Sequence, residues 1–67
     1  MNLLKLKAKC VEKAIDRKEL GFIWGTSQSS IQRKLSGKSP ITLDEAQRFA
    51  KAAGLTDAEK FDIFLSE

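Results

Sequence analysis

The chain has 67 residues, of which 42% are hydrophobic and 31% charged, with four Gly and one Pro. This composition is ordinary for a globular chain and excludes both a two-domain protein and a disordered segment. One Cys and no His exclude an internal disulfide, a Cys–His dyad and a zinc site, and no apolar run approaches a membrane span. We therefore expect one cytoplasmic domain, residues 1–67, without cofactor, metal or small-molecule ligand.

The formal charge of +3 is unevenly distributed along the chain. Residues 1–38 carry nine Lys or Arg against three acidic residues, whereas residues 39–67 carry three against six. This division predicts a positive side that meets an anionic partner and a separate acidic side. Lysine-rich helix faces that are merely solvated are the alternative.

The first element is predicted to be an amphipathic helix over residues 3–15. Apolar residues recur there at helical spacing, and lysines alternate with them. The predicted buried face is formed by Leu4, Ala8, Val11 and Ile15, with Leu3, Leu6, Cys10 and Ala14 beside it.

Two short helices are predicted next. Asp16 and Glu19 are typical of a helix start and predict a helix that runs to about Trp24. Gly25 favours the left-handed conformation that ends a helix. Ser27 is placed to cap a third helix, from Gln28 to about residue 36, which Gly37 stops.

Two capping boxes predict the remaining helices. Thr42 with Glu45 begins a fourth helix, whose apolar residues keep helical spacing as far as Gly54. Thr56 with Glu59 begins a fifth helix that runs to the C-terminus. The predicted fold is all-α, with five short helices and no strand. The apolar residues of the fourth helix are Leu43, Ala46, Phe49, Ala50 and Ala53.

The second and third predicted helices have the lengths and the short intervening turn of a helix-turn-helix. Leu20, Ile31 and Leu35, together with either Ile23 or Trp24, can face inward and fix the angle between the two helices. Gln can form a bidentate pair with adenine, and Arg can form one with guanine. The residues left outside on the third helix are Gln28, Ser29, Gln32, Arg33 and Ser36.

Four segments carry a resemblance to the lambda-repressor and Cro-like helix-turn-helix family, and the resemblance covers residues 3–65. They are RKEL (17–20), GTSQSSI (25–31), GK (37–38) and LDEAQRFAKAAGL (43–55). The resemblance implies a five-helix DNA-binding domain in which Gln28, Ser29, Gln32 and Arg33 face base edges. The phosphate contacts that we expect, by the resemblance or from the chemistry of helix ends and cations, come from Arg17, Lys18, Ser27, Ser36, Lys38 and Ser39.

Four residues depart from the pattern of that family. Arg17 stands where Gln is common, so its contact with phosphate is expected to be stronger and less directional. Gly21 stands where Ala is usual, at a position that needs a small residue. Lys34 stands where an apolar residue is frequent, so the inward face of the third helix could be rotated slightly. Phe22 stands where the family is polar, and it is either a core residue or an exposed ring that binds a partner.

Catalysis is not expected, because the chain has no His, no activated Cys and little room for a pocket. The sequence favours a Cro-like repressor of a phage or prophage that occupies operator DNA through the major groove. The alternative is a helix-turn-helix modulator that binds another repressor. Residues that either dock on the core or form a homodimer or partner interface are Phe22, Phe61, Phe64 and Leu65.

Overall fold

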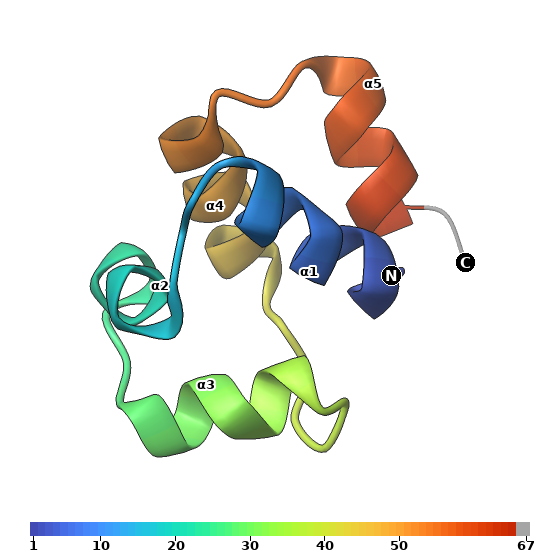
Figure 1. Ribbon diagram of the computed structural model, residues 1–67. Coiled ribbons are helices and arrows are strands. Elements are labelled where there is room, and N and C mark those ends of the chain that lie inside the picture. The colour runs from blue at the N-terminus through green and yellow to red at the C-terminus, as the bar shows by residue number, and fades with distance from the viewer. Residues whose placement is uncertain (66–67) are drawn as a thin grey trace.

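The computed structural model describes residues 1–65, which form helices joined by short turns (Figure 1). The elements are α1 (Leu3–Glu12), α2 (Arg17–Trp24), α3 (Gln28–Leu35), α4 (Leu43–Ala53), α5 (Asp57–Lys60) and a π-helix, η1 (Phe61–Leu65). Within this part of the chain there is no strand, and no helix is long and apolar enough to cross a membrane. The all-helical fold with five helices is confirmed.

Most of the predicted helix boundaries are confirmed by their capping geometry. Asp16 and Ser27 accept hydrogen bonds from the backbone N–H groups of Glu19 and Ser30, at the starts of α2 and α3. Both predicted capping boxes are present, at the starts of α4 and α5. Gly25 and Gly54 end α2 and α4 in the left-handed conformation, with φ of 63° and 66°. These caps satisfy backbone groups that helix ends leave unpaired.

The core takes one fully buried side chain from each of five elements. Each of these side chains is exposed by 2% or less. They are Leu6 of α1, Leu20 of α2, Ile31 of α3, Phe49 of α4 and Ile63 of η1. Between Ile23 and Trp24, Trp24 is the deeper residue, at 5% exposure, while Ile23 is half-buried. Because the core draws on α1, α2, α3, α4 and η1, each of these helices depends on the others for burial.

The predicted buried face of α1 is wrong. Leu4 and Val11 are 78% and 82% exposed, and Ala8 is exposed as well. The helix instead turns Leu6 into the core, with Leu3 and Cys10 packed beside it. Both sets of residues repeat at helical spacing, so periodicity alone could not choose between them. The helix also ends at Glu12, three residues earlier than predicted, and Ala14 adopts a φ of 55° in the turn to α2.

Contacts with the C-terminal helices accompany this rotation of α1. Lys5 pairs with Asp62 at 2.5 Å and Lys9 pairs with Glu59 at 2.7 Å. The backbone N–H of Asn2 also donates to the carbonyl of Ile63 at 2.8 Å. With one flank of α1 fixed in this way, the Leu6 face lies against the core.

The C-terminal segment differs from a single α-helix. α5 has only four residues, and the chain then widens into η1. Phe64 is half-buried and meets Phe49 edge to face, with ring centroids 6.1 Å apart, so it belongs to the core rather than to a free partner surface. Phe61 and Leu65 remain 60% and 68% exposed. Leu43, predicted on the apolar side of the fourth helix, is 73% exposed at the start of α4.

Glu45 joins three helices. Its carboxylate accepts hydrogen bonds from the Nζ of Lys34 at 2.5 Å and from the backbone N–H of Thr42 at 2.9 Å. Its carbonyl accepts the indole N–H of Trp24 at 2.8 Å. The Nζ of Lys34 also lies 5.9 Å from the centroid of the Trp24 ring. The polar residue at position 34 therefore tethers α3 to α4, in a place where an apolar residue would only pack.

We predict that Leu6→Ala lowers the free energy of unfolding by about 2–5 kcal/mol, because it leaves a cavity in the core. The matched variant Leu4→Ala, two residues away on the exposed face, should change it by less than about 0.5 kcal/mol. Urea unfolding of dilute protein measures both values. Equal losses would mean that α1 is rotated as its periodicity first suggested.

We predict that stability decreases in acid. Burial opposes ionisation of Glu45, but the hydrogen bonds from Lys34 and Thr42 outweigh it and hold the pKa below its usual 4.5. The hydrogen bond from Lys9 lowers the pKa of Glu59 to about 2. Because the unfolded chain binds these protons more readily, stability should be constant well above pH 4.5 and fall as the pH approaches 2.

Urea unfolding at a series of pH values tests this dependence. Glu59→Gln should flatten the lowest part of the profile and Glu45→Gln the part just below the usual carboxyl pKa. A profile that neither variant changes would assign the acid sensitivity to other carboxylates.

Candidate nucleic-acid interface

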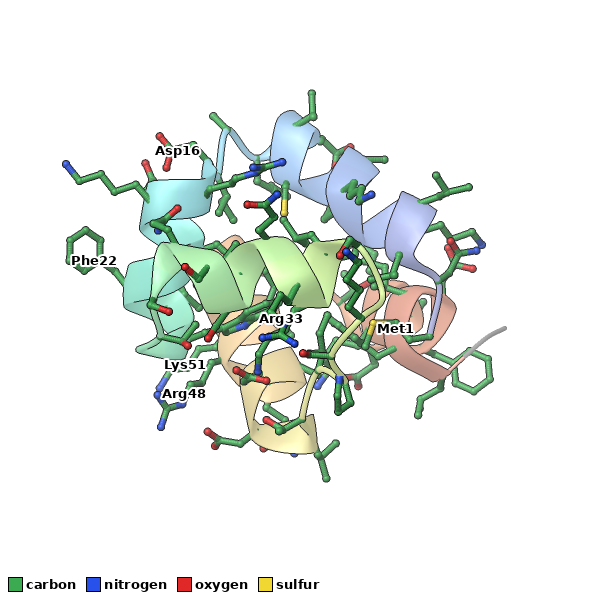
Figure 2. The ribbon with its side chains drawn as sticks, turned by 90° about the horizontal axis from the view of Figure 1, so that it is seen from below. Met1, Asp16, Phe22, Arg33, Arg48 and Lys51 are labelled. Carbon is green, nitrogen blue, oxygen red and sulfur yellow. The ribbon has the colours of Figure 1, made fainter. Side chains whose placement is uncertain are left out.

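α3 lies along one edge of the molecule, with no other helix beyond it (Figure 1). Its residues predicted to face outward are all exposed, and Ile31 alone among its residues is fully buried. Figure 2 looks onto this edge and shows α3 across the front of the molecule, with Arg33 extending from it. The exposed residues of α3 and its C-cap are Gln28, Ser29, Gln32, Arg33 and Ser36.

The turn between α2 and α3 fixes how this edge is presented. Gly25 reverses the chain, and the N–H of Thr26 donates to the carbonyl of Gly21 at 3.0 Å. Ser27 then starts α3. Leu20 and Ile31 pack together in the core on the inner side of the pair. This geometry is compatible with a helix-turn-helix in which α3 is the outer helix.

Gln28 folds back onto α2. Its side-chain amide donates to the carbonyl of Arg17 at 3.0 Å, so one donor of the predicted base-reading group is engaged within the protein. Gly21 makes room for this arrangement, since an added Cβ would lie 2.8 Å from the Gln28 amide nitrogen and 3.2 Å from the carbonyl of Thr26. The base-reading role of Gln28 remains a prediction.

A groove of about 510 Å³ runs between α1, the start of α2 and α3. Arg17, Gln32 and Ser36 line it, as does Lys7 of α1. Lys7 was absent from the residues predicted to meet phosphate, because that prediction drew only on residues 17–39. Cys10 also lines the groove, and burial raises the pKa of its thiol, which keeps it neutral. The groove thus places two cations beside α3.

The remaining residues predicted to bind phosphate differ in how free they are. Lys18 and Lys38 are exposed, while Ser39 is half-buried. The hydroxyl of Ser27 caps α3, and that of Ser36 donates to the carbonyl of Arg33 at 3.1 Å. Of these residues, the two lysines are therefore the most available to an anion.

Two cations from the acidic half of the chain also come near α3. Figure 2 shows Arg48 and Lys51 of α4 together at the edge of the molecule below the start of α3. A Cβ on Gly25 would lie 3.9 Å from the Arg48 guanidinium, which places Arg48 beside the turn between α2 and α3. Arg48 is held by Asp44, with an N–O distance of 2.8 Å. The net charge of residues 39–67 did not indicate these two cations, because acidic residues outnumber basic residues in that segment.

Ion pairs divide the basic residues of the chain into two groups. Among residues 1–65, the pairs with acidic residues of the second half engage Lys5, Lys9, Lys34, Arg48 and Lys60. The ion pairs within this range leave out seven basic residues, which are Lys7, Lys13, Arg17, Lys18, Arg33, Lys38 and Lys51. The positive charge that stays available is thus concentrated on α3 and on the residues next to it.

Phe22 is exposed, which decides between the two alternatives for this residue. Its ring is 78% exposed and projects from α2 at the side of the molecule (Figure 2). It contributes nothing to the core.

We predict that Gly21→Ala releases the Gln28 side chain from the Arg17 carbonyl. The new methyl group needs the space of the Gln28 amide, and the gain in helix propensity of up to about 1 kcal/mol offsets the lost contact. Stability should therefore change little, while the side-chain amide signals of Gln28 shift in NMR spectra. In a Gln28→Ala background the same substitution should be more favourable. An unshifted amide would contradict the predicted displacement.

Chemically, this surface can donate and accept hydrogen bonds from α3 while cations beside α3 neutralise a polyanion. No curated protein and no solved structure matches the chain significantly. A comparison with protein families matches residues 4–65 to the BetR domain. The chain therefore belongs to the BetR domain family, a family of small helical domains of the DNA-binding type.

Proposed function

We propose that this protein is a sequence-specific DNA-binding transcriptional regulator that acts by binding and not by catalysis. The observation that carries the proposal is the exposed edge of α3, where Gln32 and Arg33 stand free of the core. Membership of the BetR domain family supports a regulatory role.

In the proposed complex α3 enters the major groove of double-stranded DNA. Arg33 can pair with the N7 and O6 of guanine, and Gln32 with the N6 and N7 of adenine. Lys7 and Arg17, in the groove on one side of α3, would meet phosphates of the DNA backbone. Lys38, just beyond the end of α3, would meet phosphates near the other end of the helix.

The resemblance to Cro-like proteins supports a finer proposal, which is repression by operator occupancy. A bound domain of this size would exclude polymerase or a competing repressor from the same DNA. The origin of such a regulator in a phage or prophage is part of this proposal.

A second candidate function is modulation of another repressor through protein contacts. The observation that favours it is the exposure of Phe22, with Phe61 and Leu65 also exposed. Apolar rings on a small domain are common at protein interfaces.

A gel shift with DNA that flanks the protein's own gene tests the two functions against each other. Retarded DNA with this protein alone, competed by unlabelled specific DNA but not by random DNA, supports the repressor. Retardation that requires a neighbouring repressor supports the modulator. No shift under either condition contradicts DNA-directed regulation.

We predict that Arg33→Ala weakens binding to the cognate site by about 1–3 kcal/mol and relaxes base preference at one position, because a bidentate contact to a base is lost. Fluorescence anisotropy with cognate and single-base variant duplexes measures both effects. An equal loss on random DNA would show instead that Arg33 contacts phosphate.

We predict that Lys38→Ala weakens binding to cognate and random DNA alike and reduces the slope of log K against log salt by about one, because one phosphate contact is lost. Lys60→Ala is the matched control, since Lys60 pairs with Asp57 on α5, at the far side of the molecule from α3 (Figure 1). The control should leave the slope unchanged. An unchanged slope in Lys38→Ala would remove this residue from the interface.

A further inference from the structure

An apolar stripe with no partner runs along the outer side of α1. Leu4 and Val11 are 78% and 82% exposed, and exposed Ala8 lies between them. With about 100° between successive helical residues, these three side chains share one side of the helix, opposite Leu6. This outward stripe, Leu4–Ala8–Val11, has the helical spacing that a buried face would have, although it is exposed.

The two flanks of the stripe differ in charge and in what they contact. On one flank lie Lys5 and Glu12, about two helical turns apart, where Lys5 pairs with Asp62 and Glu12 with Lys9. On the other flank Lys7 lines the groove beside α3. The stripe therefore lies between a flank that carries both signs of charge and a flank that is basic.

We propose that the outward stripe binds the same stripe of a second copy of this chain, with the two α1 helices antiparallel. When the pair is centred close to Ala8, Leu4 of each copy meets Val11 of the other. The small side chain of Ala8 at the centre lets the helices approach closely. On the mixed flank, Lys5 of each copy comes opposite Glu12 of the other, so the charges are complementary in this orientation.

The symmetry of such a pair also suits the proposed DNA-binding edge. An antiparallel helix pair has its twofold axis perpendicular to the plane that contains both helices, so the same flank of each helix points the same way. The Lys7 flank lies toward α3, and the Lys5 flank lies toward η1. Both copies of α3 would therefore face one side of the dimer, as a twofold-symmetric operator requires.

The stripe is short, and this sets the expected strength of association. α1 has ten residues, and two helices of this length bury less than the roughly 1,200–2,000 Å² of a stable specific interface. The two Lys7 side chains also approach each other on the α3 flank and repel. Association should therefore be weak and depend on protein concentration when DNA is absent.

Cysteine cross-linking in the full chain without DNA tests the contact directly. In a Cys10→Ser background, Ala8→Cys should form a disulfide-linked dimer under mild oxidation, because the twofold axis brings the two Cβ atoms together. Ala52→Cys, an exposed position on α4, is the matched control and should stay monomeric. Equal cross-linking at both positions, or none at Ala8→Cys, would overturn the proposal.

Sedimentation up to about 1 mM protein tests the energetics. Val11→Glu should weaken association at least tenfold, whereas Phe61→Ser, on the other exposed apolar surface, should not. Glu12→Lys should weaken it, and Lys5→Glu added to Glu12→Lys should restore it, although the intramolecular contacts of Lys5 with Asp62 and of Glu12 with Lys9 are lost. Loss of the dimer by Phe61→Ser alone would assign the interface to η1. These measurements use no DNA, so their failure would leave the proposed DNA-binding function standing.

Discussion

Glu45 is the residue on which the arrangement of the central helices depends. It completes the capping box of α4, its carboxylate holds Lys34 of α3, and its carbonyl holds the indole of Trp24 at the end of α2. The helices of the proposed DNA-binding pair are thus fixed to the same turn of α4. A largely buried ion pair of this kind is costly to break by removing one partner, because the other charge is left unpaired. The exposed edge of α3 keeps its orientation because Lys34, on the inner side of α3, is held by Glu45.

Acidic residues of the second half of the chain neutralise only some of the basic residues of the first half. Glu59 and Asp62 engage the lysines on the side of α1 that lies next to the C-terminal helices, and Glu45 engages the one lysine of α3 that points inward. Lys7, Arg17, Lys18, Arg33 and Lys38 form no ion pair among residues 1–65, whereas Arg48 is held by Asp44. A modest net charge of +3 is therefore compatible with a strongly basic edge.

α1 links the two surfaces that we propose to be functional. Its inner side supplies Leu6 to the core, one flank supplies Lys7 to the groove beside α3, and its outer side presents the apolar stripe. Because these surfaces lie on different sides of one short helix, a second copy and a DNA backbone bound to them would lie at defined angles to each other. The exposed ring of Phe22, which projects from α2, belongs to neither of these two surfaces.

The sequence by itself determined the number of helices and nearly all of their ends, because caps and left-handed glycines act within a few residues. It also placed Gln32 and Arg33 on the outside of α3, since only one side of that helix is apolar. The tertiary structure decided the rotation of α1, where two apolar sides had the same period and only the Leu6 side meets the core formed by the other helices. It also decided the role of Lys34 and the recruitment of Lys7 and Arg48 to the edge of α3. These depend on residues distant in sequence, and local pattern carries no information about them.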